Sequence, residues 1–144
     1  MRILVQRSNN ARVEIDKKVV GEISSGLVLF VGFTEGDNEE NIDYLINKVL
    51  NLRIFEDENG VMNKSILEYG GEILSVSQFT LYANTKKGNR PSYVDALRPE
   101  EATKLYDLFN KKLSEKISVS TGIFGEDMLV YISNVGPTTI MLEK

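Results

Sequence analysis

The residues best placed to do chemistry are three polar side chains within the otherwise apolar stretch VSQFTL. They are Ser77, Gln78 and Thr80. If the stretch is a strand, alternation puts Gln78 and Thr80 on the same face as Leu74 and Val76. A buried polar group without a hydrogen-bond partner costs about 1–3 kcal/mol. The pattern therefore fits either a satisfied Thr and Gln in a core strand, or a pocket floor that offers a hydroxyl, an amide and backbone N–H groups.

The chemistry open to these residues is narrowed by what the chain lacks. Its 144 residues include no His and no Cys. Ser-His-Asp and Cys-His mechanisms are therefore excluded, and so are disulfides and the commonest zinc ligands. An EF-hand loop that starts at Asp57 would need Gly at its sixth position, where Met62 stands. No phosphate-binding P-loop or dinucleotide motif occurs, and we expect neither a metal nor a cofactor.

Charge gives one candidate binding element. The formal net charge of −4 argues against non-specific binding to nucleic acid. The loop TKKGNRP nevertheless gathers Lys86, Lys87 and Arg90. Ordinary solubilising charge is the favoured interpretation from sequence alone, and a phosphate-facing loop is the alternative. No apolar run approaches the ~18 residues of a membrane span, and the first residues lack a signal-peptide core. We expect a cytoplasmic protein.

A Gly–Pro pair, Gly136–Pro137, interrupts the strand-like stretch SNVGPTTIML near the end of the chain. Pro lacks the amide proton that a sheet ladder needs, and Gly allows backbone conformations that other residues avoid. Two interpretations fit these properties. The pair is either a turn between two strands or a rigid loop that presents its own backbone to a ligand.

Periodicity predicts two helices that would hold these elements in place. Residues 36–53 carry an apolar stripe at helical spacing, with Asp37 or Asn38 as the N-cap. Residues 98–116 carry a second stripe, with Pro99 at the first helical position. The expected stripes are Ile42, Leu45, Ile46 and Val49 in the first helix, and Ala102, Leu105, Tyr106, Phe109 and Leu113 in the second.

The rest of the chain reads as short strands with tight turns, such as the one at Asn59–Gly60. Strands are expected at 2–8, 11–15, 19–24, 26–33, 70–83, 117–124, 128–135 and 138–143. The run 26–33 is continuously apolar, which is typical of a strand buried on both faces. We expect one α+β domain over residues 1–144, with mostly antiparallel sheets in a barrel-like or sandwich arrangement and two main helices packed on one side.

The motifs SQFTL at 77–81 and NVGPTT at 134–139 resemble those of the D-aminoacyl-tRNA deacylases. The similarity extends over essentially the whole chain. Further similar text comprises QR at 6–7, GEI at 21–23, RIF at 53–55, GG at 70–71, RPSY at 90–93, LYD at 105–107 and TGIFGEDM at 121–128. One departure is Glu126, where this family more often has Ala.

The resemblance implies hydrolysis of the ester that joins a D-amino acid, or glycine mischarged on tRNA(Ala), to the 3′-terminal adenosine of tRNA. It also implies a homodimer in which a Gly–cis-Pro pair enters the partner's site, here Gly136–Pro137. Two successive carbonyls of such a pair would hold the substrate ammonium group. An L side chain would then meet rigid backbone, so that chirality is read by steric exclusion.

The resemblance also implies roles for individual residues. Backbone N–H groups around Phe79 and Thr80 would bind the ester oxygen. Because no base is available to activate Thr80, we favour an attacking water aided by the ribose 2′-OH. The catalytic group is thus Ser77, Gln78, Phe79 and Thr80; chiral selection involves Gly136, Pro137, Met128 and Arg7; and Lys86, Lys87 and Arg90 are candidates for tRNA contacts. A non-catalytic RNA-binding module and a small structural β-rich protein remain as alternatives.

Overall fold

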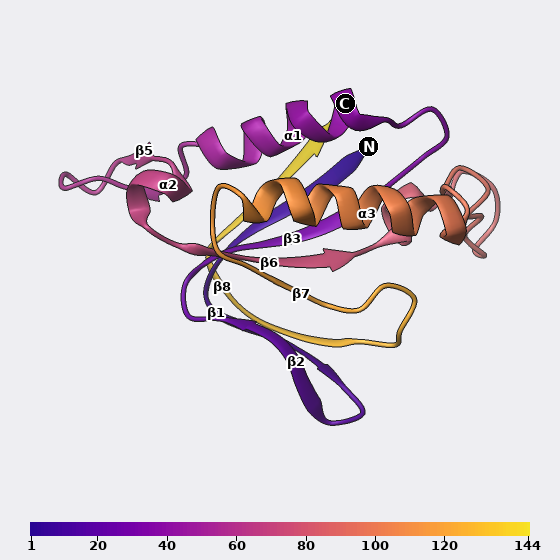
Figure 1. Ribbon diagram of the computed structural model, residues 1–144, viewed down its shortest axis with the longest axis horizontal. Coiled ribbons are helices and arrows are strands. Elements are labelled where there is room, and N and C mark those ends of the chain that lie inside the picture. Colours follow the sequence, from indigo (N-terminus) through magenta and orange to yellow (C-terminus); the bar gives the residue numbers. More distant parts are fainter.

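The computed structural model describes all residues, 1–144, and is built around one six-stranded sheet. The strands run in the order β2-β1-β3-β6-β7, and β8 pairs with β1 as well. The strong curvature of this sheet brings it close to a closed barrel (Figure 1). The bounds are β1 Arg2–Ile15, β2 Lys18–Ile23, β3 Gly26–Gly32, β6 Glu72–Ser77, β7 Val119–Thr121 and β8 Leu129–Glu143. The α+β, barrel-like prediction is confirmed.

Pairing within the sheet is mixed. β1 pairs antiparallel with β2, β3 and β8, whereas β3–β6 and β6–β7 are parallel. β3 and β6 lie in the middle of the strand order, where both faces of a strand are covered, and β7 lies at its edge. β3 is accordingly buried along almost its whole length, as its apolar sequence predicted.

Two strands are longer than the sequence indicated. β1 continues through Asn9 and Asn10, and β8 continues through Gly136 and Pro137. The ladder between them breaks where Gln6 pairs with Thr139 and Ser8 with Asn134. Arg7 therefore faces residues 135–138, which bulge out of the sheet, and we refer to these residues as the Gly–Pro loop. Because a bulged residue makes no ladder bond, Pro137 is accommodated inside a strand.

Two helices cover one face of the sheet, side by side in Figure 1. They are α1 Glu39–Asn51 and α3 Pro99–Ser114. Asn38 is the N-cap of α1 and forms a capping box with Asn41, and Pro99 opens α3, as predicted. Lys112 of α3 forms ion pairs with Glu39 and Asp43 of α1. All predicted stripe residues are buried except Leu105, which is half-buried, and Leu50 of α1 is buried in addition.

The largest apolar cluster fills the space between these helices and the sheet. Phe109 and Leu113 of α3 are fully buried there, with Ile42 and Leu45 of α1. Burying each such side chain stabilises the fold by roughly 1.5–3 kcal/mol. A smaller cluster on the opposite face of the sheet includes Val13, Leu74 and Val76. No helix of the structure combines the length and the apolar character that crossing a bilayer requires.

A short hairpin and a single helical turn connect α1 to β6. The hairpin consists of β4 Phe55–Glu56 and β5 Met62–Lys64, joined by the turn that Asn59–Gly60 predicted. The helical turn, α2 Ile66–Tyr69, was missed. Its signal was present in the sequence, because Ser65 and Glu68 form a capping box around it.

Candidate active site

The polar stretch singled out in the sequence forms the end of β6 and a tight turn. The strand predicted over residues 70–83 was wrong beyond Ser77. Gln78 leaves the sheet, and Phe79–Tyr82 form a 3₁₀ turn, η1. The alternation argument therefore does not apply to Gln78 and Thr80. The reason is local: the amide of Gln78 still bonds to the Val31 carbonyl at 2.7 Å, but no strand partner follows it.

The turn leaves two backbone donors free. Its first internal bond runs from the Leu81 amide to the Gln78 carbonyl, at 3.3 Å. The amides of Phe79 and Thr80 precede that bond, and no side chain caps the turn. Two adjacent N–H groups at the edge of a strand are thus available to a negatively charged oxygen.

Side chains around the turn hold it in place but supply no base. The side-chain Nε2 of Gln78 donates a hydrogen bond to the Thr80 hydroxyl. An amide N–H cannot accept a proton, so this contact does not activate Thr80 as a nucleophile. Burial, and after it the charge of Asp37, raises the pKa of Tyr82 to about 12. Burial likewise raises the pKa of Tyr106 below the strand, and both phenols stay protonated at neutral pH.

Close packing fixes the turn against β3. A Cβ atom added to Gly32 would lie 2.8 Å from the Gln78 carbonyl oxygen and 3.3 Å from the Leu81 Cβ. Contacts this short are not found for real Cβ atoms against backbone, so only Gly fits beneath the turn. Gly32 is a supporting residue that the sequence analysis did not identify.

A largely apolar hollow of about 410 Å³ opens beside the turn. Ser77 and Phe79 line it, together with Tyr93, Phe124 and the start of α3. Phe79 is 56% exposed and meets Tyr93 edge to face, with ring centroids 5.1 Å apart. Arg98 is the only lining residue with a permanent charge. The hollow can therefore hold a flat apolar group but contains no carboxylate that could act as a general base.

The Gly–Pro loop forms a second feature. Its Gly136–Pro137 bond is cis, as the resemblance implied, and Gly136 has a φ of +116°. A Cβ atom on Gly136 would lie 2.5 Å from Thr138 Oγ1 and 2.6 Å from the Thr138 nitrogen. Both the backbone conformation and the lack of space therefore require Gly at this position.

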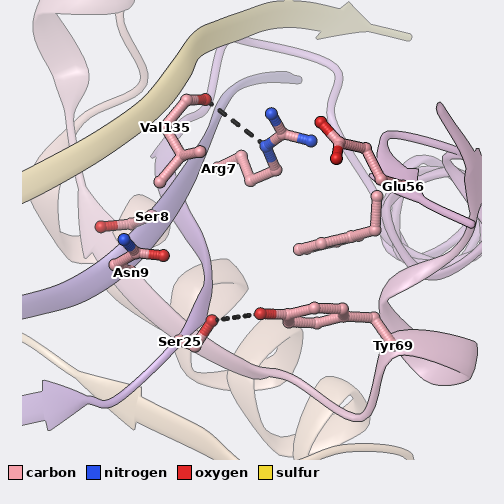
Figure 2. Close-up of a pocket in the computed structure, with 8 residues that line it drawn as sticks. Arg7, Ser8, Asn9, Ser25, Glu56, Tyr69 and Val135 are labelled. Atoms are coloured by element: carbon pink, nitrogen blue, oxygen red, sulfur yellow. Dashed lines mark hydrogen bonds between the residues drawn. The ribbon is translucent and has the colours of Figure 1, made fainter. Parts of the chain in front are cut away.

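Arg7 supports the loop from below. Its guanidinium is buried and donates from Nη1 to the Ile54 carbonyl at 2.7 Å and from Nε to the Val135 carbonyl at 3.4 Å. Figure 2 shows Arg7 between Val135 and Glu56 at a pocket of about 170 Å³ behind the loop. The structure thus brings Arg7 and the Gly–Pro loop together.

Within one chain the loop and the turn are far apart. By register, Ser77 lies level with Val31, Ile3 and Leu142, at one end of the sheet. The Gly–Pro loop lies opposite Arg7, four residues further along β1. At ordinary strand spacings this is about 13 Å along the strands and about 14 Å across them. No residue lines both the hollow and the pocket behind the loop.

The remaining candidate residues lie at other places. Lys86, Lys87 and Arg90 are exposed, form no ion pair, and occupy the loop between η1 and α3. Met128 is half-buried against Gly122 and the smaller apolar cluster, outside the lining of the hollow. Phe124 and Gly125 of the same segment line the hollow instead.

Comparison with known proteins gives a consistent result. The family model described as D-Tyr-tRNA(Tyr) deacylase matches residues 4–143. A D-aminoacyl-tRNA deacylase of Limosilactobacillus reuteri (strain DSM 20016) is 54% identical over 145 residues, with both chains covered fully. One of Clostridium tetani (strain Massachusetts / E88) is 51% identical and covers all of this chain and 97% of its own.

Solved structures agree in fold. The c-Myc DNA unwinding element binding protein superposes with a TM-score of 0.95 at 36% identity, over 100% of this chain and 99% of that one. A probable eukaryotic D-amino acid tRNA deacylase superposes with a TM-score of 0.84 at 18% identity, over 98% and 97%. By class the chain is a deacylase, which is a hydrolase. Within that class it belongs to the D-Tyr-tRNA(Tyr) deacylase family.

Proposed function

We propose that residues 1–144 act as one catalytic domain that hydrolyses the ester bond of D-aminoacyl-tRNA. The products are the free D-amino acid and tRNA. The observation that carries this proposal is the pair of unpartnered amides at Phe79 and Thr80, in a chain whose full length matches deacylase relatives. These N–H groups would hold the carbonyl oxygen as it gains negative charge, an effect worth about 2.7–4 kcal/mol per donor in other enzymes.

The attacking group in this mechanism is water. An ester is an activated substrate, and the hollow offers no His, Cys or carboxylate to take a proton. The Thr80 hydroxyl faces only the Gln78 amide. We therefore assign positioning of the attacking water to the neighbouring 2′-OH of the terminal ribose. The water adds its oxygen to the ester carbon, the departing 3′ oxygen takes up its proton, and Thr80 shapes the pocket.

The hollow beside the turn suits the terminal adenosine. Nucleobases bind by stacking on aromatic side chains, typically with about 1–3 kcal/mol for each base. Phe79, Tyr93 and Phe124 present such surfaces next to Ser77. An adenosine seated there would place its 3′ ester at the free amides of the turn.

Chiral selection is assigned to the Gly–Pro loop, supplied by a second copy of the chain. The distance between loop and turn within one chain, roughly 20 Å over the sheet, supports a shared site. With the ammonium group and the ester both fixed, an L side chain would point into the loop and a D side chain away from it. Glycine, including glycine mischarged on tRNA(Ala), has no side chain to exclude and is hydrolysed too.

The free edge of β8 supports the homodimer that this assignment needs. β8 pairs only with β1, and its outward side chains include exposed Leu129, Tyr131 and Met141. Exposed apolar residues along an unpaired edge are a typical interaction surface. In a symmetric dimer each loop would enter the other subunit's site, which gives two equivalent active sites.

One assay tests the proposal directly. D-tyrosyl-tRNA, L-tyrosyl-tRNA and glycyl-tRNA are each incubated with the protein, and release of the amino acid is followed. We expect release from the D and glycyl esters and none from the L ester above the spontaneous rate. Binding of the tRNA without release would instead support a non-catalytic RNA-binding module. If the protein neither binds the tRNA nor releases the amino acid, the assay would support a structural role.

A further inference from the structure

Asn134 spans the base of the Gly–Pro loop with its side-chain amide. Its Nδ2 donates to the Arg7 carbonyl at 2.9 Å and to the Thr138 carbonyl at 3.1 Å. Its Oδ1 lies 3.4 Å from Gln6 Nε2 and 3.4 Å from Thr139 Oγ1. The two donors and the acceptor of the amide are therefore all in use.

Gln6 and Thr139 complete this network. Gln6 Nε2 lies 3.3 Å from the Thr139 hydroxyl, which in turn lies 3.1 Å from the Pro137 carbonyl. The single hydroxyl proton of Thr139 can serve either Pro137 or Asn134. We call the side chains of Gln6, Asn134 and Thr139 the loop clamp.

The loop clamp and Arg7 together engage every carbonyl of the loop except one. Arg7 donates to Val135, Thr139 to Pro137, and Asn134 to Thr138. No side chain donates to the carbonyl of Gly136. The bonds across the base replace the ladder bonds that the bulge removes between β1 and β8, and they hold the loop at both ends.

We propose that Asn134 is a positioning residue for the Gly–Pro loop, acting with Gln6 and Thr139. The clamp fixes the conformation in which the loop backbone is presented, and so sets the enantiomer preference of the site. This specificity role rests on the proposed function; the positioning role does not. Arg7 cannot replace the clamp, because its one hydrogen bond to the loop is to the Val135 carbonyl.

The test uses the intact protein and two independent positions. Asn134→Ala removes the whole amide, and Asn134→Asp keeps its shape but sets a carboxylate against two carbonyl oxygens. Thr139→Val removes only a hydroxyl, and Thr139→Ser restores it. Ser120→Ala is the matched control, because Ser120 also donates to a backbone carbonyl of the sheet, that of Glu22, at 2.8 Å.

Two measurements decide the outcome. Hydrogen–deuterium exchange should become faster at the amides of residues 135, 136, 138 and 139 in both Asn134 variants and in Thr139→Val, and stay unchanged in Thr139→Ser and Ser120→Ala. The ratio of D-ester to L-ester hydrolysis rates should fall about tenfold in Asn134→Ala, as expected for the loss of about two hydrogen bonds. A loss of folded protein alone would lower the D-ester rate and leave L-ester hydrolysis at its spontaneous rate, whereas a displaced loop would raise L-ester hydrolysis above that rate.

The two proposals fail in distinguishable ways. If wild-type protein hydrolyses neither ester, the proposed function is wrong, and faster exchange in the loop still supports the positioning role. If wild-type protein discriminates between the esters but Asn134→Ala keeps both its ratio and its loop exchange, the clamp proposal is overturned. Faster exchange with an unchanged ratio overturns the specificity role.

Discussion

At the scale of single residues, the proposed site is built mainly from backbone. The free amides of Phe79 and Thr80 and the loop at Gly136 provide the proposed chemistry. Side chains such as Gln78 and Arg7 hold that backbone in position. Substitutions that change backbone geometry should therefore be more damaging than those that change side-chain chemistry.

Phe79→Pro tests the amide contribution. Phe79 is the first residue of η1, where a proline is sterically tolerated, and Gln78 before it lies outside the α region (φ −148°, ψ 83°). The variant removes one N–H donor and also the phenyl ring. Phe79→Ala removes only the ring and is the matched control. We expect kcat for D-tyrosyl-tRNA to be about 100- to 1,000-fold lower in Phe79→Pro than in Phe79→Ala. Equal values in the two variants would exclude the Phe79 amide from the mechanism.

Thr80→Ala tests the choice of nucleophile. Because the Thr80 hydroxyl has no base beside it, we expect the variant to retain near-normal single-turnover hydrolysis. Rapid-quench measurements on D-tyrosyl-tRNA provide the rate. An acyl-enzyme that is trapped in the wild type and lost in the variant would instead identify Thr80 as the nucleophile.

At the scale of elements, the features that the sequence predicted correctly are those that depend on residues close together in the chain. Helical periodicity and caps located α1 and α3 to within a few residues, because Asn38, Pro99 and the apolar stripes act within their own segment. The parallel pairing of β3, β6 and β7 depends on contacts between distant segments and was not predicted. The 3₁₀ turn at Phe79 was taken for strand, since its apolar and β-favouring residues carry no breaker.

The same reasoning explains what was and was not predicted of the candidate site. The resemblance implied that the turn, the Gly–Pro loop and Arg7 are parts of a site. The structure shows free amides at the turn and a hydrogen bond from Arg7 to the Gly–Pro loop. The side chains that support these parts were missed. Gly32 acts through a close approach between two strands' ends, and Asn134 through bonds across a bulge. Neither leaves a periodic signal in the sequence.

The loop between η1 and α3 allows a test at the element scale. Lys86, Lys87 and Arg90 are exposed and unpaired, so each is free to bind a phosphate. In the triple alanine variant we expect weaker tRNA binding, and the slope of log K against log salt should fall by about 0.7–0.9 for each phosphate that is no longer neutralised. Filter binding between 50 and 200 mM salt measures it. Replacing exposed Lys104, Lys111 and Lys116 by alanine is the charge-matched control. An unchanged slope would mean that the charges of this loop only keep the protein in solution and do not bind phosphate.

At the scale of the whole molecule, the main prediction is a site divided between two subunits. The curved sheet holds the turn at one end of β6 and the Gly–Pro loop near the other end, on a strand with a free edge. One chain therefore carries both the turn and the Gly–Pro loop, but it does not bring them together in one site. The proposal predicts that residues 1–144 become active only when two chains associate.

Complementation between two inactive variants tests this division. Phe79→Pro damages the turn, and Gly136→Ala damages the loop, because its Cβ would clash with Thr138. After subunit exchange about half of the dimers should be mixed, each with one intact site, so that activity recovers to about a quarter of the wild-type value. Each variant is taken through the same exchange alone as a control. If sedimentation confirms mixed dimers but activity does not recover, the turn and the loop of each site come from the same chain, and the divided site is wrong.

A catalyst made of main-chain groups also has a chemical consequence. Alkylating agents and mild oxidants inactivate many hydrolases by modifying thiol or imidazole groups. Because the chain has no Cys and no His, neither group is present to be modified. The proposed hydrolysis of D-aminoacyl-tRNA should accordingly persist during oxidative stress, under conditions that stop thiol-dependent enzymes.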